Sequence, residues 1–258
     1  MFPAYSHSSS TFALRALLDA LAPLIGAEEA TGKVVPAGWA TDASPETLKS
    51  WREAGIAHQN DLDLLIQDVF IPEYKRLMRA RLGLVTARDD DLSKIIEPLL
   101  NVMFRHDLDF HATFRALAVP CGDIASWKPE DVDVDKLLIS PLRTTALDTA
   151  RSDLRDWLKI YHARRADDAT SASSMLNANP RFILRQWVLE EVIKRIGEDV
   201  PSGRRVLAKL LQMCEKPFEK WGGEGKEEVD LSAEEIEERR MCGVGDTGML
   251  GFQCSCSS

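Results

Sequence analysis

The fold is decided by the stretch from Met175 to Arg195, which reads MLNANPRFILRQWVLEEVIKR. Asn179 is a favourable N-cap residue, and Pro180 suits the first position of a helix because its missing amide hydrogen would be unpaired there in any case. Apolar residues then recur at helical spacing and form one broad face: Ile183, Leu184, Trp187, Val188, Val192 and Ile196. We therefore expect a helix that begins at Pro180 and is buried against more than one neighbour.

Two arginines lie at the N-terminal end of this expected helix. Arg181 and Arg185 are one turn apart, where the helix dipole disfavours positive charge. The commoner arrangement would pack their aliphatic stems along the surface. Alternatively, their guanidinium groups reach a carboxylate or a phosphate elsewhere in the fold. The sequence leaves both interpretations open.

Composition and charge limit the classes of protein to which the chain can belong. The chain has 258 residues, of which 45% are hydrophobic and 28% are charged, as in an ordinary soluble globular protein. The net charge of -9 argues against a nucleic-acid partner. No apolar run approaches the roughly 20 residues that a membrane span requires. The first 26 residues lack both the arginines of a mitochondrial presequence and the basic start and cleavage site of a secretory signal, so we expect no clear targeting segment.

The rest of the chain shows helical spacing of apolar residues between loops that contain Gly and Pro. The expected helices cover residues 11–27, 44–55, 58–82 with a kink at Pro72, 89–106 with a bend at Pro98, 109–118, 144–165 and 204–214. Gly83 is expected to form the C-cap of the third of these. No alternating β-strand pattern of useful length and no internal repeat is found. The predicted fold class is all-α.

We expect four segments along the chain. Residues 1–118 form a helical segment, 119–143 a loop insertion at the surface, and 144–221 a second helical region that contains Asn179 and Pro180. Residues 222–258 begin with a glycine-rich and acidic run, which we expect to be a solvated linker or an exposed helix, and end in a tail with two cysteines.

Two short motifs resemble nucleotide sites without their structural context. Gly243–Gly248 matches G-x-G-x-x-G, but that motif needs a strand before it and a helix after it, and neither is expected here. Arg105–Leu108 reads like a kinase catalytic loop with His and Arg exchanged, and position 112 holds Ala where the metal-binding Asn would stand. We reject both interpretations.

A cluster of possible metal ligands also lies in this region, at His106, Asp107, Asp109 and His111. The two histidines are five residues apart and so lie on different faces of a helix, whereas ligands four apart would share one face. An ordinary polar pair of Asp107 and His111 explains the pattern better.

The five cysteines are Cys121, Cys214, Cys242, Cys254 and Cys256, an odd number that does not indicate a secreted disulfide framework. Cys242, Cys254 and Cys256 lack the second well-spaced pair that a zinc site requires. Cys254 and Cys256 lie at the end of the chain, where thiols are accessible to oxidation or exchange. An inert exposed tail is the alternative, and composition does not choose between them.

Several segments, taken in order, resemble the selenoprotein O family of protein-kinase-like adenylyltransferases. They are Tyr74–Leu84, Asp109–Phe110 with Thr113–Arg115 and Leu117, Trp157–Arg165, Asn179–Pro180 with Leu184–Arg185 and Trp187, and Pro217–Phe218. Cys256 stands third from the end, where some members of the family carry selenocysteine. Each segment alone is a weak signal, whereas their combination in order, from about Ala13 to the last residue, is specific.

The resemblance implies transfer of AMP from ATP, with Mg²⁺ or Mn²⁺, to Ser, Thr or Tyr of other proteins. It also implies that this chain corresponds only to the C-terminal helical region, which packs on an N-terminal kinase-like core. The sequence would then be a fragment, a truncated version of a longer protein, or a natural short form. In this reading the chain contains no catalytic, cofactor-binding or metal-binding residue, and alone it transfers no AMP.

The resemblance further implies a mitochondrial location and a redox role for Cys256, which would pair with a cysteine of the kinase-like core. The partners would be that core and the protein substrates. Two other classes of function remain open from the residues alone. One is a non-catalytic helical interaction module that binds a protein through its broad apolar face. The other is a thiol-redox protein that uses Cys254 and Cys256, although C-x-C at a chain end lacks the helix N-terminus that lowers thiol pKa values.

Overall fold

The computed structural model describes residues 3–118, 127–139, 147–166, 168 and 172–245. The chain forms two compact units, unit 1 at Met1–Arg76 and unit 2 at Leu77–Ser258. The division between them falls inside the expected segment 1–118. The described residues are helices, turns and loops with no strand, so the prediction of an all-α chain is confirmed. In the described residues, no helix combines the length and the apolar character needed to cross a membrane.

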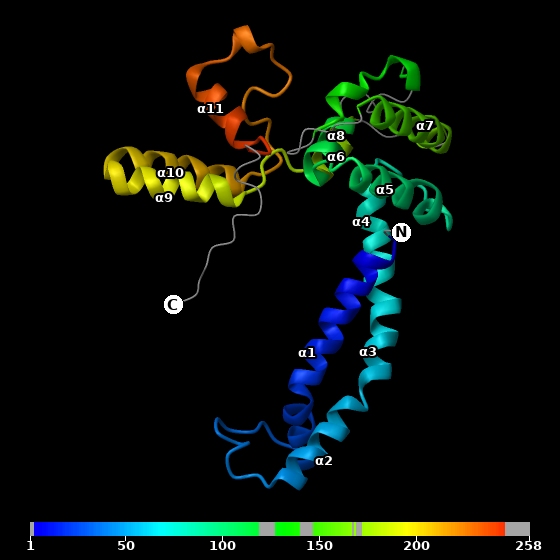
Figure 1. Ribbon diagram of the computed structural model, residues 1–258, viewed down its shortest axis with the longest axis vertical. Helices are drawn as coiled ribbons and strands as arrows, with labels where there is room; N and C mark the ends of the chain where they lie inside the picture. The colour runs from blue at the N-terminus through cyan, green and yellow to red at the C-terminus, as the bar shows by residue number, and fades with distance from the viewer. Residues whose placement is uncertain (1–2, 119–126, 140–146, 167, 169–171, 246–258) are drawn as a thin grey trace. The chain divides into compact units, whose positions relative to one another are not determined.

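Unit 1 is built on two antiparallel helices, α1 (Pro3–Thr31) and α2 (Pro45–Ile56) (Figure 1). Glycine allows their backbones to touch: a Cβ atom at Gly55 would lie 2.1 Å from the carbonyl oxygen of Ala22, and one at Gly26 would lie 1.9 Å from that of Trp51. No side chain separates the helices at these positions, so Gly26 and Gly55 allow the close crossing of α1 and α2.

The predicted ends of these helices are only partly right. Ser44 caps α2 by accepting a hydrogen bond from the amide of Thr47 at 3.2 Å, as expected for a Ser-Pro start. Helix α2 was expected to end at residue 55 and ends at Ile56, so Gly55 lies within its last turn. Helix α1 contains Pro23 and continues to Thr31, beyond the expected end at residue 27.

The expected long helix over 58–82 is divided into α3 (Gln59–Leu65), the π-helical turn η1 (Ile66–Phe70) and α4 (Ile71–Arg81). A second π-helical turn, η2 (Leu92–Ile96), precedes α5 (Glu97–Arg105). Each of these turns ends two residues before a proline, at Pro72 and Pro98. Proline lacks the amide hydrogen that continues an α-helix, and the wider turn absorbs this interruption. Gly83, with φ of 64°, closes α4 as predicted.

One core of unit 2 surrounds α7 (Leu147–Arg165). Its buried face is aromatic and aliphatic, and the indole nitrogen of Trp157 donates to the carbonyl of Ile95 at 2.9 Å. The hydroxyl of Tyr161 donates to the carbonyl of Leu82 at 2.5 Å. These bonds tie α7 to η2 and to the end of α4, and α6 (Phe110–Ala118) packs against the short α8 (Ala172–Ala178).

Residues 127–139 contain the 3-10 turns η3 (Pro129–Asp131) and η4 (Val134–Lys136). The described part of the expected surface loop 119–143 has an exposed charged side and a buried apolar side. Its apolar side chains are buried: Trp127, Val132, Val134 and Leu137. Residues with this composition fill the core even without a long helix, because burial depends on apolar area and not on secondary structure.

A second core of unit 2 lies between α9 (Gln186–Glu198), α10 (Val200–Glu215) and α11 (Ala233–Met241). Helices α9 and α10 lie side by side, and a 3-10 turn, η5 (Glu228–Asp230), precedes α11 (Figure 1). The core comprises Phe182, Trp187, Val188, Val192, Leu210, Met213, Met241 and Cys242.

The predicted helix start at Asn179 and Pro180 is wrong, because α9 begins at Gln186. The amides of Arg181 and Phe182 both donate to the carbonyl of Pro217, at 2.7 and 3.0 Å, instead of facing a helical turn. Leu184, expected on the buried face, is 42% exposed. Hydrogen bonds to the distant carbonyl of Pro217 therefore take the place of the expected first helical turns over residues 179–185.

Candidate functional site

Arg115 on α6 is a buried charged side chain of unit 2 that makes five hydrogen bonds to other described residues. It is 3% exposed, and all five of its N–H donors are used. Nε and Nη2 bind the two carboxylate oxygens of Glu224 at 2.9 and 2.5 Å, and Nη1 donates to the carbonyls of Leu176 and Asn179 at 2.7 and 2.6 Å. A longer bond of 3.4 Å reaches the carbonyl of Phe218. One guanidinium therefore joins α6 to three other segments of the chain.

Asn179 extends this network to α4. It is fully buried, and its side-chain nitrogen donates to the carbonyls of Arg81 and Met175 at 2.8 and 3.0 Å. Its side-chain oxygen accepts from Nη1 of Arg81 at 3.2 Å. Asn179 therefore acts as a long-range clamp and not as the helix N-cap that the sequence suggested.

Glu224 is held by a glycine turn. Gly222 has φ of 69°, and a Cβ atom there would lie 2.4 Å from Cα of Arg239, so the chain passes too close to α11 for any other residue. Arg239 donates to the carbonyl of Gly222 at 2.8 Å, and the amide of Gly222 donates to Glu238 at 3.1 Å. Of the two expectations for this region, a solvated linker does not describe residues 222–224, which fold back and deliver a carboxylate to Arg115, whereas residues 233–241 do form a helix, α11.

The two arginines of the 179–185 segment reach carboxylates, which was the second interpretation from the sequence. Arg185 binds Asp109 through both terminal nitrogens, at 2.9 and 3.0 Å. Burial raises the pKa of Asp109, but the hydrogen bonds from Arg185 and from the amide of Ala112 lower it more, so the net pKa lies below its usual value. Nε of Arg181 lies 3.8 Å from Glu224 and donates to the carbonyl of Trp221 at 3.3 Å.

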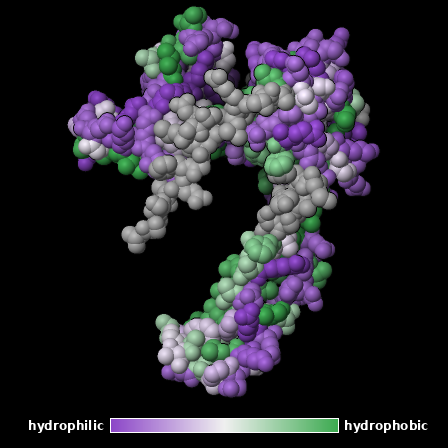
Figure 2. Space-filling model, in the orientation of Figure 1, coloured by the Kyte–Doolittle hydropathy of each residue, from purple (hydrophilic) through white to green (hydrophobic). Residues whose placement is uncertain are grey.

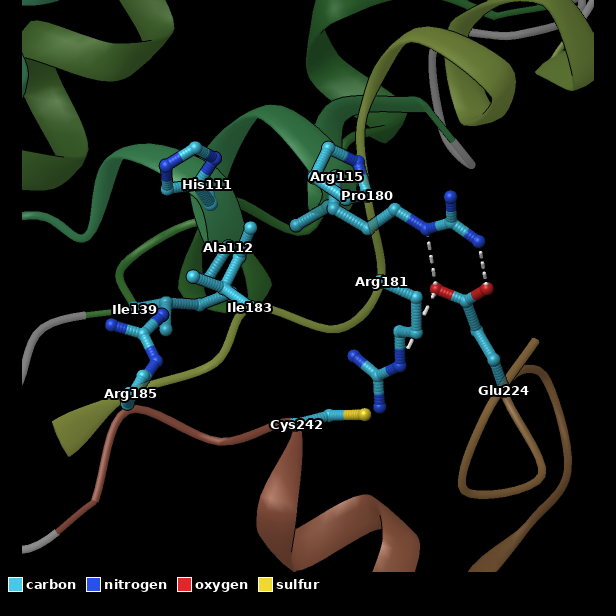
Figure 3. A pocket seen from close by; sticks show the side chains of 11 residues that line it. His111, Ala112, Arg115, Ile139, Pro180, Arg181, Ile183, Arg185, Glu224 and Cys242 are labelled. Atoms are coloured by element: carbon cyan, nitrogen blue, oxygen red, sulfur yellow. Dashed lines mark hydrogen bonds and ion pairs between the residues drawn. The ribbon is translucent and has the colours of Figure 1, made fainter. Parts of the chain in front are cut away.

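These side chains surround a cavity of about 100 Å³ in unit 2 (Figure 3). Its polar lining comes from His111, Arg115, Arg181, Arg185 and Glu224, and its remaining lining from Ala112, Ala116, Ile139, Pro180, Ile183 and Cys242. Two buried nitrogens here have no hydrogen-bond partner within the described part of the chain, Nδ1 of His111 and Nε of Arg185. Buried polar atoms are nearly always paired, so these two mark the cavity as the candidate functional site.

Burial lowers the pKa of His111, and the charge of Arg81 lowers it further, against an opposing effect of Asp109. His111 is therefore neutral near neutral pH, and each ring nitrogen is either a donor or an acceptor according to the tautomer.

A second buried ionic group lies around Arg164 on α7. Its guanidinium binds Asp91 at 2.5 and 3.1 Å, Asp168 at 2.7 Å and the carbonyl of Thr86 at 2.5 Å. The amide of Thr86 donates to Asp168 at 3.0 Å. Burial raises the pKa of Asp168, but the bonds from Thr86 and Arg164 lower it more. These charges are matched within the fold, so we interpret this group as structural.

The residues considered as metal ligands are not brought together. His106 bonds Asp153 at 2.8 Å, Asp109 binds Arg185, and Asp107 occupies a turn with φ of 51°. Among the described residues, no three His, Cys, Asp or Glu side chains form a group that could hold a metal ion.

The predicted redox residues Cys254 and Cys256 lie outside the described residues, as does Cys121. Of the described cysteines, Cys214 is exposed and Cys242 is buried beside the cavity. Burial raises the pKa of the Cys242 thiol to about 11, so this thiol is protonated and unreactive near neutral pH.

Comparison with known proteins identifies the family. The family model of protein adenylyltransferase SelO matches residues 13–215. A protein nucleotidyltransferase YdiU of Burkholderia vietnamiensis is 30% identical over 207 residues, which are 79% of this chain and 34% of that protein. A protein of the same name from Xanthomonas oryzae pv. oryzae is 29% identical over 161 residues, which are 61% of this chain and 29% of that protein. The chain thus spans about a third of the length of these curated relatives. Because the family model covers most of its residues, the chain belongs to the SelO family.

Proposed function

We propose that this chain is the C-terminal helical region of a protein nucleotidyltransferase that transfers AMP from ATP to Ser, Thr or Tyr of other proteins. The match of residues 13–215 to the family model carries the proposal. In this proposal ATP and Mg²⁺ or Mn²⁺ bind to a kinase-like core outside these 258 residues, in a mitochondrial enzyme. The chain supplies no catalytic residue and orients that core.

An exposed apolar face on unit 1 supports the docking role. Leu14, Leu17 and Leu21 follow one side of α1 at helical spacing and are all exposed. Leu64 and Leu65 on α3 and Val69 on η1 are more than half exposed. Figure 2 shows hydrophobic side chains at the surface along these helices. Apolar surface of this kind is typical of a site that another protein segment covers.

The docking role is tested in the complete protein by Leu17→Gln combined with Leu65→Gln. Glutamine is a good helix former, so the change removes apolar area with little cost in helix propensity. Val34→Gln is the matched control, because Val34 is also exposed but lies in the loop between α1 and α2. We expect the double variant to lower transfer of labelled AMP to a protein acceptor while the control keeps it.

The enzymatic assignment has its own test. The complete protein should transfer labelled AMP in the presence of Mg²⁺ or Mn²⁺, and the 258 residues alone should not, because nucleotidyl transfer depends on positioned cations and phosphates. Metal-dependent labelling by the chain alone would contradict the proposal. Failure of the complete protein to label any acceptor would favour the alternative, a non-catalytic helical interaction module.

We also propose that Cys256 is a redox thiol that forms a disulfide with a cysteine of the kinase-like core. Two thiols would lose two electrons and two protons to an oxidant such as oxidised glutathione. Cys256→Ser should abolish any difference in activity between reducing and oxidising buffer, with Cys214→Ser as the control. An unchanged redox response in the Cys256 variant would refute this role.

A further inference from the structure

We propose that the cavity between α6, the 179–185 segment and the Glu224 turn binds a single phosphate-sized oxyanion, held by Arg181, Arg185 and His111. The SelO family match assigns no ligand to this cavity, and the proposal does not depend on the AMP-transfer activity.

The first argument is the supply of unused donors. The terminal nitrogens of Arg181 have no hydrogen bond to the described part of the chain, since the only hydrogen bond of its side chain there runs from Nε to the carbonyl of Trp221. Nε of Arg185 and Nδ1 of His111 are buried beside the same cavity without partners. In Figure 3 His111 comes from α6, Arg181 and Arg185 come from the 179–185 segment, and the three side chains border one space. Guanidinium groups match the geometry of phosphate oxygens, so a bound oxyanion would satisfy donors that the protein leaves unpaired.

The second argument is the local charge. The cavity is lined by three arginines and one glutamate, and Asp109 behind Arg185 adds a second negative charge, which leaves a local excess of one positive charge. Arg115 contributes its charge but no donor, because its five N–H groups are already bonded. The whole chain carries a net charge of -9 and repels anions at long range. Binding of an anion would therefore depend on this cavity and not on the general field of the protein.

The third argument is size. A volume of about 100 Å³ exceeds the roughly 10–15 Å³ that one water requires. It is well below the roughly 300 Å³ at which pockets for larger organic ligands begin. A tetrahedral oxyanion fits between these limits, whereas a nucleoside does not. AMP should therefore bind no more tightly than inorganic phosphate.

The site also predicts a proton linkage at His111. Its surroundings include Arg81, Arg185 and Asp109, and burial together with the two arginines keeps the ring neutral. An oxyanion against Nδ1 would favour the charged imidazolium and raise the pKa of His111. Phosphate binding should therefore take up protons near neutral pH.

The test is isothermal titration of the 258-residue chain with inorganic phosphate near neutral pH and at low ionic strength. Arg181→Gln should weaken binding by about tenfold or more, because charge-assisted hydrogen bonds are lost. Arg204→Gln is the matched control: it makes the same change of charge at an exposed residue of α10 and should leave the affinity within about twofold. Absence of phosphate binding, or equal losses in the two variants, would overturn the proposal. AMP binding about tenfold tighter than phosphate would overturn the assignment to a single oxyanion.

A measurement on the unaltered chain keeps the test decisive if Arg181→Gln disturbs folding. Phosphate should shift the ring nitrogen resonances of His111 and raise its pKa. The ring of His58 in unit 1, which bonds Glu29 at 2.5 Å, should not respond. If His111 does not respond at saturating phosphate, the cavity does not bind this anion.

Discussion

Replacing Arg115 by methionine should destabilise unit 2 by about 3–5 kcal/mol, the range observed when one partner of a buried ion pair is removed. Methionine keeps an unbranched apolar stem, so the change isolates the loss of the guanidinium. Because Arg115 joins four segments of unit 2, the loss should be felt across the unit and not only on α6.

The magnitude follows from the groups that would be left behind. The carbonyls of Leu176, Asn179 and Phe218 would lose a charged donor, and each such bond contributes about 1.5–3 kcal/mol. Glu224 would lose both bonds to its carboxylate. These contributions do not add, because they share one side chain and because the side chain of Glu224, 15% exposed, can recover some hydration. The sum is therefore reduced to the stated range.

Native-state hydrogen exchange is the appropriate assay, because it reports the free energy of opening of unit 2 separately from unit 1. Arg151→Met is the control: Arg151 also binds a carboxylate through two nitrogens, that of Asp135 at 2.7 and 3.1 Å, but at the surface. Its substitution should have a much smaller effect. If Arg115→Met costs less than about 1 kcal/mol, or no more than the control, the buried network does not hold unit 2 together. Combining Arg115→Met with Glu224→Met should recover part of the loss, because the carboxylate that Arg115 neutralised is removed with it.

Three further outcomes are expected. Gly55→Ala should destabilise unit 1 by about 1–3 kcal/mol, because the added Cβ atom would overlap the backbone of α1. The control Gly197→Ala should cause no such loss of stability, because nothing lies within 4 Å of the added atom, and hydrogen exchange measures the stability of both variants. The pKa of Asp109 is lower in the folded protein than in the unfolded chain. The stabilising contribution of Asp109 is therefore complete above about pH 4 and is lost as the pH falls through the folded pKa. Denaturant unfolding across this pH range measures the effect, and Asp109→Asn should lack this part of the pH dependence. Cys242 should be alkylated by iodoacetamide more slowly than the exposed Cys214, as followed by mass spectrometry, and equal rates would contradict its burial.

Local signals in the sequence predicted the features that depend on local physics. The Ser44-Pro45 helix start and the C-cap at Gly83 were predictable, because each depends on a few neighbouring residues. The same reasoning failed at Asn179 and Pro180, which have the same local chemistry as a helix start. There the carbonyls of Pro217 and Arg81 and the guanidinium of Arg115 bind the segment from a distance, and no local signal reveals them.

The candidate site was predictable only in part. The arginine pair at Arg181 and Arg185 was identified, together with the possibility that it reaches a carboxylate, but the choice of partner was not. Asp109 and Glu224 each lie within a region that holds several acids. Glu224 in particular belongs to a run whose composition is typical of a solvated linker. The close approach of Gly222 to α11 is what places Glu224, and not another acid of the run, beside Arg115. In the sequence, the glycines at 222 and 223 were the signal for a turn at this point.

The contacts of Glu224 also bear on where the structural unit ends. The family model stops at residue 215, yet Arg115, inside the matched region, is neutralised by a carboxylate beyond it. The carbonyl of Pro217 similarly holds the 179–185 segment, and Met241 and Cys242 complete the core around α9 and α10. A buried guanidinium without its carboxylate would carry a large desolvation cost. Residues 216–242 are therefore part of the same folding unit as the matched helices, and the cavity exists only when both are present.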